Sequence, residues 1–397
     1  MNSIFRLVVL SILAAGITVA EAAEKDSPAS AIGGGDAGLG AGTGNAAETD
    51  QPIFKLGGFG TLGASHSSQK LGDYVVDGTV PKGAGLSNNW AWGNDSRIGV
   101  QATASFTPKV SAILQVISEY QYDGSSRPSI EWANVKYAVT PDAYIRAGRI
   151  VLPSFLNSDN RKVGYSYPWL HPPVDVYRQR AITNSDGLDA MYRFGIGEAE
   201  NSIKIIYGRN KIDYLTNMST SRGIRGIFDT FEYGPAKLRV GYQEREFQSK
   251  NHQTGVIGPW TPSSDLSAGA SYDPGKWFVI SEWIERKSTT KIHAMYISAG
   301  YRIDKITPYL AYSQDSPAST LPGFIATAAS IQSAKNSQNT VSLGMRWFFM
   351  KNTDLKLQYD QVHLSDNSNG NLLNVPVGVT LYGTRFHVIS AALDFVF

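Results

Sequence analysis

The residues best suited to chemistry are six histidines, and they are scattered along the chain. No two of them lie within five residues of each other; they are His66, His171, His252, His293, His363 and His387. The sequence therefore contains no local pair of imidazoles for a metal ion, although folding could bring distant ones together. Cysteine is absent, which excludes a disulfide framework, a thiolate metal site and a cysteine nucleophile.

His66 and Ser67 are the one adjacent pair that suggests nucleophilic catalysis. A hydrolase would need a serine hydroxyl within hydrogen-bond reach of a histidine. Adjacent residues of a strand point to opposite faces, so these two side chains could not easily cooperate. A hydrolase remains an alternative hypothesis, and the sequence predicts no enzyme and no cofactor.

The segment Gly58-Phe59-Gly60-Thr61-Leu62-Gly63 matches a dinucleotide-binding glycine pattern. Such a site needs a strand before the glycines and a helix after them. Here the glycines lie within a strand-like segment, and a polar stretch follows. We therefore interpret them as glycines of a tightly curved strand.

The chain ends on a segment, Phe386 to Phe397, that alternates between two faces. Period-2 alternation over a dozen residues predicts a strand with one apolar face. A strand that ends on an aromatic residue could close a barrel. The apolar row consists of Ile389, Ala391, Leu393, Phe395 and Phe397.

Composition and the first residues indicate an exported protein without membrane helices. Only 18% of residues are charged, against about 25% in soluble domains, and the net charge is +2. The near-neutral balance predicts no nucleic-acid partner. Residues 1–22 predict a cleaved signal peptide, because Arg6 precedes an apolar run from Leu7 to Ala20 and an Ala20-x-Ala22 pattern. A transmembrane anchor is disfavoured, because this run is shorter than the ~20 residues of a span. Residues 23–52 are rich in Gly and Ala and predict a flexible segment.

From Ile53 to Phe397 we expect a β-barrel of sixteen strands. Short turns are expected at 107–109, 140–142, 197–201, 233–235, 273–275, 303–305 and 351–354. Polar loops are expected between them at 66–95, 121–129, 151–186, 209–222, 246–265, 286–291, 313–338 and 364–383. Both termini then fall on the side of the short turns, as in bacterial outer-membrane barrels.

Alternation recurs within these strands and predicts a lipid-facing row. Ile98, Val100 and Phe106 oppose Arg97, Gly99 and Gln101, for example. A soluble sandwich would alternate in the same way. The signal peptide, the terminal Phe and aromatics near the turns favour a membrane barrel. The expected aromatic girdle comprises Phe106, Tyr144, Phe194, Tyr233, Tyr272, Trp277, Tyr301, Phe349 and Phe397.

The chain resembles the Gram-negative porin superfamily, which consists of trimeric sixteen-stranded outer-membrane barrels. The resemblance covers most of the chain after the signal peptide and lies in five segments, 57–68, 96–102, 111–121, 131–150 and the last strand. Residues 163–177 resemble a little-characterised proteobacterial porin group.

This resemblance implies an all-β transmembrane barrel, an assembly as a homotrimer and recognition of the terminal Phe397 by the outer-membrane assembly machinery. It also implies that Arg97 faces the lumen and that the third loop, Val151 to Asp186, folds inward and narrows the pore. This loop departs from the PEFGG-type signature of general-diffusion porins, so its selectivity cannot be carried over.

The charges of the third loop and of the wall are the candidate functional residues, because opposed charges across a narrow gap set a pore's field. At about 35 residues, this loop is longer than most structureless loops. The constriction candidates are Asp159, Arg161, Lys162, Asp175, Arg178 and Arg180. The lumen-wall candidates are Arg97, Glu119, Asp189, Arg193, Arg239 and Arg346, while the facing of Arg146 and Arg149 is left open.

The function that we expect is passive diffusion of small hydrophilic solutes and ions across the outer membrane. An excess of lumen Arg and Lys over Asp and Glu suggests a mild anion preference. The aromatic, charged third loop also motivates an alternative, a substrate-specific channel, and an adhesive or structural barrel is a further one.

Overall fold

The computed structural model describes residues 53–316, 319–320 and 337–397. The expected signal peptide, 1–22, and the flexible segment, 23–52, lie outside the described residues and stay predictions. Most of the expected loop at 313–338 also lies outside the described residues.

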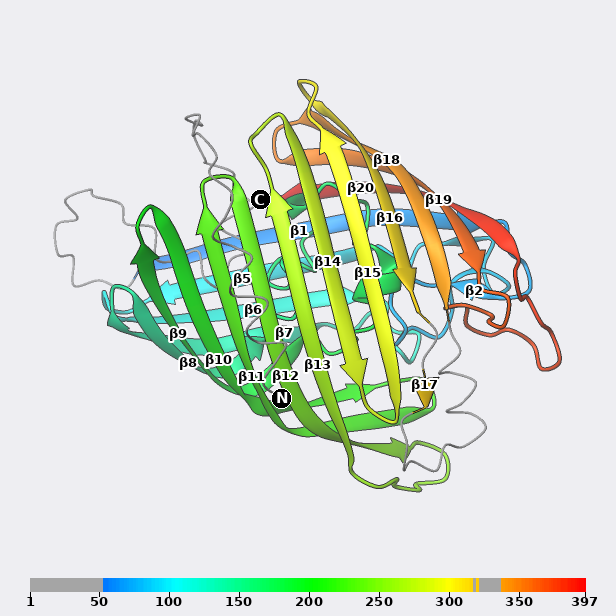
Figure 1. Cartoon of the computed structure of the whole chain (residues 1–397), viewed down its shortest axis with the longest axis horizontal. Helices are drawn as coiled ribbons and strands as arrows, with labels where there is room; N and C mark the ends of the chain where they lie inside the picture. Colours follow the sequence, from blue (N-terminus) through cyan, green and yellow to red (C-terminus); the bar gives the residue numbers. More distant parts are fainter. Residues whose placement is uncertain (1–52, 317–318, 321–336) are drawn as a thin grey trace.

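Sixteen long strands lie within the described residues and form one closed antiparallel barrel (Figure 1). In chain order they are β1 (Ile53–Ser67), β5 (Arg97–Ser105), β6 (Val110–Glu119), β7 (Ser129–Thr140), β8 (Ala143–Val151), β9 (Asn184–Ile196), β10 (Ala199–Asp213), β11 (Asn217–Tyr233), β12 (Ala236–Asn251), β13 (Thr261–Tyr272), β14 (Trp277–Lys287), β15 (Thr290–Tyr301), β16 (Ile306–Asp315), β18 (Gln338–Met350), β19 (Thr353–Leu364) and β20 (Arg385–Val396). The short elements are β2 (Asp73–Tyr74), β3 (Ala84–Gly85), β4 (Trp90–Ala91), β17 (Ser319–Thr320), a 3-10 turn η1 (Gly164–Ser166) and a one-turn helix α3 (Val174–Tyr177).

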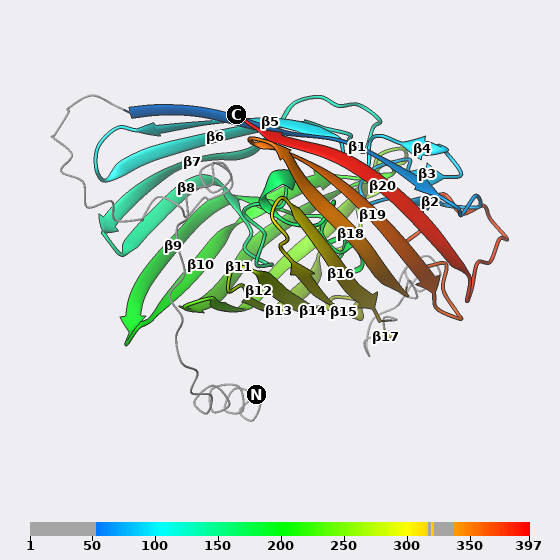
Figure 2. The same cartoon turned by 90° about the horizontal axis from the view of Figure 1, so that it is seen from above.

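The terminal strand closes the barrel, as its alternation predicts. β20 pairs with β1 from Phe59↔Val396 to Ser67↔Val388, and β1 pairs on its other side with β5. Figure 2 shows β1 and β20 running side by side. Closure leaves no open sheet edge, which a lipid environment requires.

The glycines of the rejected dinucleotide pattern lie at this seam. A Cβ atom on Gly58 would lie 2.2 Å from the ring of Phe397, and one on Gly60 would lie 2.4 Å from the ring of Phe395. These glycines therefore leave room for the aromatic rings of the last strand, a role that the pattern alone does not reveal.

The seven expected short turns all connect consecutive strands where they were predicted. Three of the expected long loops are wrong, because 209–222, 246–265 and 286–291 consist largely of strand. β10 and β11, for example, are separated only by residues 214–216. Cross-strand ion pairs support the extended hairpins, such as Arg222–Glu246 at 2.9 Å and Arg225–Glu244 at 2.5 Å. The polar residues of these three stretches begin where the apolar lipid-facing rows end, but the strands continue past that point.

The apolar rows face outward, as predicted. Ile98, Leu188, Leu343 and Ile389 are about half exposed, at 50%, 50%, 59% and 46%. The alternate rows are buried inside the barrel: on β20 Val388, Ser390 and Asp394 are fully buried.

One member of the expected aromatic girdle faces the wrong way. Tyr144 is buried, and the guanidinium group of Arg146 lies 5.0 Å from its ring centroid. Tyr144 and Arg146 share the inner face because they are two residues apart on β8. Phe106, Tyr233, Trp277, Tyr301, Phe349 and Phe397 are exposed as expected. Within the described residues, no helix has the length and hydropathy needed to cross a membrane.

Candidate functional site

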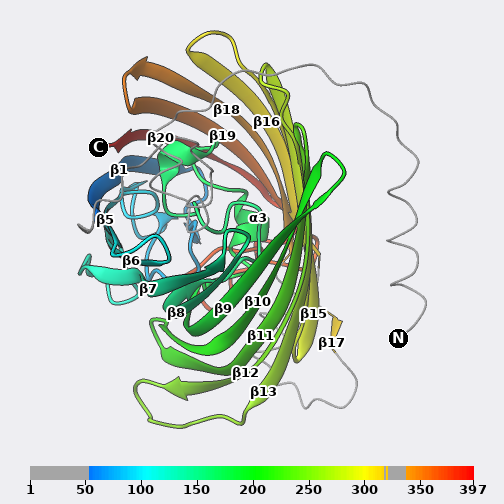
Figure 3. The same ribbon diagram turned by 90° about the vertical axis from the view of Figure 1, so that its left-hand side faces the viewer.

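The long segment between β8 and β9, residues 152–183, packs against the inner side of the wall. It carries α3, which lies inside the ring of strands in Figure 3. The Trp169 indole donates to Ser298 Oγ at 2.8 Å, and the Tyr177 hydroxyl donates to Glu282 Oε1 at 2.7 Å. Lys356 Nζ donates to the Gly164 carbonyl at 2.6 Å. The segment is thus bound to β14, β15 and β19.

Aromatic side chains explain this docking. Phe155, Tyr167, Trp169, Val176 and Tyr177 of the segment form one buried cluster with wall residues. The Trp169 and Tyr296 rings meet edge to face, with centroids 5.7 Å apart. Such contacts stabilise a loop without regular structure. The wall residues of the cluster are Phe278, Ile284, Ala294, Tyr296 and Tyr309.

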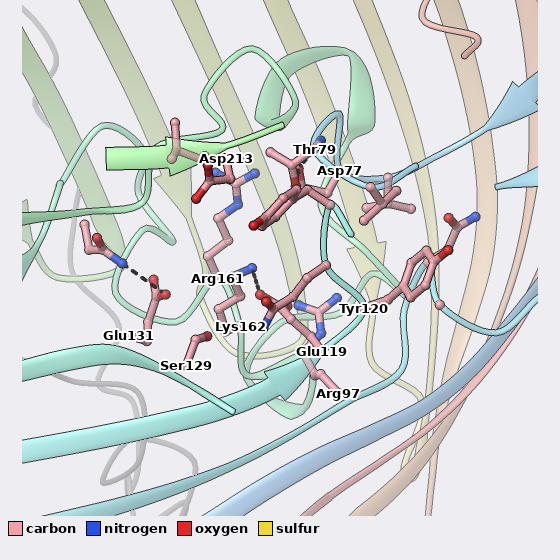
Figure 4. A pocket seen from close by; sticks show the side chains of 18 of the residues that line it. Asp77, Thr79, Arg97, Glu119, Tyr120, Ser129, Glu131, Arg161, Lys162 and Asp213 are labelled. Carbon is pink, nitrogen blue, oxygen red and sulfur yellow. Dashed lines mark hydrogen bonds and ion pairs between the residues drawn. The ribbon is translucent and has the colours of Figure 1, made fainter. Parts of the chain in front are cut away.

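A cavity of about 300 Å³ remains on the opposite side of the segment (Figure 4). It is bounded by the third loop, by the loop between β1 and β5 and by the ends of β5, β6, β7 and β10. Its charged lining side chains are Asp77, Arg97, Glu119, Glu131, Arg149, Arg161, Lys162, Lys211 and Asp213.

Opposed charges meet in this cavity. Lys162 Nζ of the loop lies 2.5 Å from Glu119 Oε1 of the wall, and Figure 4 shows Arg161 beside them. Arg161 donates to the carbonyls of Arg180, at 2.6 Å, and Tyr177, at 3.0 Å.

The pKa of Asp77 shows that the basic residues of the third loop stabilise negative charge in the cavity. Burial alone would raise the pKa of the Asp77 carboxyl, but Lys162, Arg161 and hydrogen bonds from Thr79 lower it below its usual value. Asp77 therefore stays ionised and faces the two basic residues of the third loop.

The six constriction candidates divide into two groups. Arg161 and Lys162 line the cavity, whereas Asp159, Asp175, Arg178 and Arg180 do not. Asp175 accepts hydrogen bonds from Ser313, at 2.8 Å, and Gln338, at 2.7 Å. Arg178 donates to the Asn371 carbonyl.

The constriction candidates that do not line the cavity lie in the part of the third loop that packs against the wall. Arg180 pairs with Asp265 at 2.5 Å, and half-buried Asp159 contributes no side chain to the cavity. Because the segment packs against the wall on one side, its residues on that side form anchoring contacts.

Two of the wall candidates, Arg97 and Glu119, line the cavity. The other four form hydrogen bonds to the third loop or ion pairs with neighbouring residues of the wall. Arg239 donates to the Phe155 carbonyl at 2.9 Å, and Arg346 donates to the Tyr165 carbonyl and pairs with Asp354 at 2.6 Å. Asp189 pairs with Arg146 at 2.5 Å, and Arg193 pairs with Glu200 at 3.0 Å.

The pair Arg146–Asp189 also settles the facing that the sequence left open. Arg146 is buried on the inner face, while Arg149 forms a half-exposed pair with Asp186 at 2.7 Å.

Sequence reasoning missed a buried contact between the third loop and its neighbours. His171 Nδ1 lies 3.1 Å from Asp95 Oδ1, and its Nε2 lies 3.1 Å from the Tyr74 hydroxyl and 3.8 Å from Asp360 Oδ2. Burial lowers the pKa of His171, but the attraction and hydrogen bond of Asp95 and the charge of Asp360 outweigh it and raise that pKa above its usual value. Residues so far apart in sequence give no local signal.

The residue pair that suggested a hydrolase does not form a catalytic arrangement. His66 Nδ1 contacts the Asn89 carbonyl at 2.7 Å, while Ser67 is fully buried. Across 53–316, 319–320 and 337–397, no histidine ring is hydrogen-bonded to a serine hydroxyl, and no group of three His, Asp or Glu could hold a metal ion.

Comparisons with known proteins agree with this geometry. A family model described as "Gram-negative porin" matches residues 180–367. The chain is similar in fold to the DcaP outer-membrane channel of Acinetobacter baumannii, with a TM-score of 0.55 and 12% identity over 87% of this chain and 97% of that one. No curated protein matches the sequence significantly.

Two further solved structures have the same fold. An anion-selective porin from Comamonas acidovorans has a TM-score of 0.52 and 14% identity over 87% of this chain and all of its own. OmpT of Vibrio cholerae, in a trimer form, has a TM-score of 0.55 and 11% identity over 88% of this chain and all of its own. The chain is therefore a closed sixteen-stranded barrel with the fold of these outer-membrane proteins, and residues 180–367 match the Gram-negative porin family.

Proposed function

We propose that this channel lets small hydrophilic solutes and ions cross the outer membrane by passive diffusion, with a preference for anions. The cavity between the third loop and the wall carries the proposal, because its lining contains side chains that steer ions. The basic lining residues are Arg97, Arg149, Arg161, Lys162 and Lys211, and the acidic ones are Asp77, Glu119, Glu131 and Asp213. A narrow, charged passage selects solutes by width and field.

The anion preference depends on which charges reach the cavity. Five basic side chains face four acidic ones there, and the Lys162–Glu119 pair at 2.5 Å removes one charge of each sign, so one positive charge remains in excess. The likeness to the anion-selective Comamonas porin supports the fold alone at 14% identity, so the preference is argued from these residues.

We further propose that the protein is a homotrimer, assembled by machinery that recognises the terminal strand. A protein of the same fold is described in a trimer form. Phe397 is 63% exposed on the outer face, where a recognition partner could reach it.

Planar-bilayer recordings test the proposal. We expect large stepwise openings that arrive in threes and a reversal potential of anion sign in a salt gradient. A barrel without conductance would contradict the channel function, and a cation-selective one would contradict the anion preference.

A substrate-specific channel is a second candidate, favoured by buried Arg180, whose carbonyl accepts a hydrogen bond from Arg161 of the cavity, and by Arg286, which shares the Asp265 carboxylate with Arg180. Saturable current that a solute blocks would distinguish it from free diffusion.

A further inference from the structure

We propose that the inner wall of β12, β13 and β14, together with the third loop, binds a small tetrahedral oxyanion such as inorganic phosphate or the phosphoryl group of a phosphate monoester. The inference rests on the proposed channel function and names a solute class for it. The site is an arginine cluster formed by Arg180, Arg245, Asp265 and Arg286.

Strand register brings the wall residues of the site together. Gln243 is paired with Asp265 and Arg245 with Ser263, while Asp265 is paired with Arg286 on its other side. Partners in register point to the same face of a sheet. That face is the inner one, because Gln243, Ser263 and Asp265 are 2%, 4% and 4% exposed.

Two guanidinium groups share the Asp265 carboxylate in this cluster, and a third, that of Arg245, lies near them. Arg180 contacts Asp265 Oδ2 at 2.5 Å, and Arg286 contacts Asp265 Oδ1 at 3.1 Å. Arg245 lies within electrostatic range of Arg180, Asp265 and Arg286. Three positive charges against one negative charge leave an excess of two, and buried charges are stable only when they are paired.

Several donors at the site have no acceptor within the described part of the chain. Arg245 Nε and Nη1 and Arg180 Nε are buried without a hydrogen-bond partner. Gln243 Nε2 and Ser263 Oγ are also buried donors without a partner, and Gln243 Oε1 is an unpaired acceptor beside them. Buried donors are almost always satisfied in folded proteins, so this concentration on one patch indicates a ligand with several acceptor oxygens.

The arrangement favours a tetrahedral dianion. The unpaired donors come from the loop, from β12 and from β13, so they approach from different directions. A carboxylate offers two oxygens in one plane, whereas a phosphate presents oxygens on several sides and suits bidentate guanidinium binding. A dianion would also balance the excess of two charges.

The cluster adjoins the transport cavity. Arg161, which lines that cavity, donates to the carbonyl of Arg180 at 2.6 Å. We infer that an anion held at the cluster changes the field at Arg161 and so reduces the current of smaller ions through the cavity.

The test is block of chloride current by inorganic phosphate in planar bilayers, at constant ionic strength. We expect saturable block of the wild-type channel. Arg245→Gln should weaken the apparent phosphate affinity by roughly tenfold or more, because it removes a charged hydrogen-bond donor. Arg302→Gln is the matched control, because the Arg302 side chain is 39% exposed and pairs with Asp273 away from the site; it should leave the affinity unchanged.

The possible results distinguish failure of the proposed anion site from failure of the proposed channel function. A conducting wild type without saturable phosphate block overturns the site and leaves the channel function standing, whereas a silent wild type contradicts the channel itself. Equal block of Arg245→Gln and wild type, or stronger block by succinate than by phosphate, also overturns the site. If Arg245→Gln does not assemble, isothermal titration of wild type with phosphate decides, since an absence of binding heat at millimolar phosphate refutes the proposal.

Discussion

At the residue scale, the cavity is organised by pairs of opposite charge from separate loops. Lys162 and Glu119 meet across the gap at 2.5 Å, and Asp77 faces the same lysine. The sequence predicted Arg161, Lys162, Arg97 and Glu119 as candidates, because their residue types and their place in a long loop or an inward row were visible. It did not predict Asp77, which a loop turns toward the cavity, or Glu131 and Asp213, which line the cavity from the loop-side ends of β7 and β10.

Lys162→Glu should shift selectivity toward cations. Replacing a positive charge by a negative one beside Glu119 repels anions, and one charge at 4 Å in water is worth about 1 kcal/mol, so we expect roughly a fivefold fall in the anion-to-cation permeability ratio. Reversal potentials in a salt gradient measure it. Lys109→Glu, on an exposed short turn, is the control and should leave the ratio unchanged.

His171 should make the docking of the third loop dependent on pH. Its pKa is raised in the folded protein, so the contribution of its protonated form is fully present below its unfolded pKa of about 6.5 and is lost as pH rises through the folded pKa. The charges of Asp95 and Asp360 attract the protonated His171 ring, and the charge of Arg97 repels it. The Tyr74 hydroxyl lies 3.1 Å from His171 Nε2.

Current fluctuations should therefore increase with rising pH in the wild type. In His171→Gln this increase should be absent, whereas His293→Gln, a half-exposed histidine, should behave as wild type. Identical pH profiles for wild type and His171→Gln would refute this role of His171.

At the scale of elements, the barrel could be read from the sequence and the packing of its third loop could not. Alternating rows such as Ile98 and Val100 against Arg97 and Gln101 predict strands and their facing. The polar stretch 209–222 does not show where β10 ends, because backbone pairing continues beyond the apolar band. Asp175 and Arg180 show no sign in the sequence that they contact β16 and β13, since tertiary folding alone brings them there.

Gly164→Val should loosen the third loop. A Cβ atom at Gly164 would lie 2.1 Å from Asp394 Oδ1 and 2.6 Å from Thr61 Oγ1, and both side chains are buried in the wall. Overpacking of this kind costs about 1–3 kcal/mol.

We expect noisier, larger openings and a lower unfolding temperature for this variant. Gly195→Ala is the control, since its Cβ atom would meet nothing closer than the Ala199 carbonyl at 3.9 Å. Unchanged conductance and stability of Gly164→Val would show that η1 does not hold the loop in place.

At the scale of the whole molecule, pairing of β1 with β20 closes the barrel. The closed wall separates an apolar outer surface from a charged internal cavity. The seam could be foreseen from the alternating last strand, but the glycines beneath Phe395 and Phe397 could be explained only once the rings were placed. The outward rows face lipid, and the inward loop leaves a charged cavity on one side of the lumen.

The central claim is that this passage conducts ions and prefers anions. Single-channel recording of the purified, refolded protein in a planar bilayer with a salt gradient tests it most directly. We expect large steps in groups of three and a reversal potential of anion sign. A silent barrel would contradict the channel function, and a reversal potential of cation sign would contradict the selectivity assigned to the cavity.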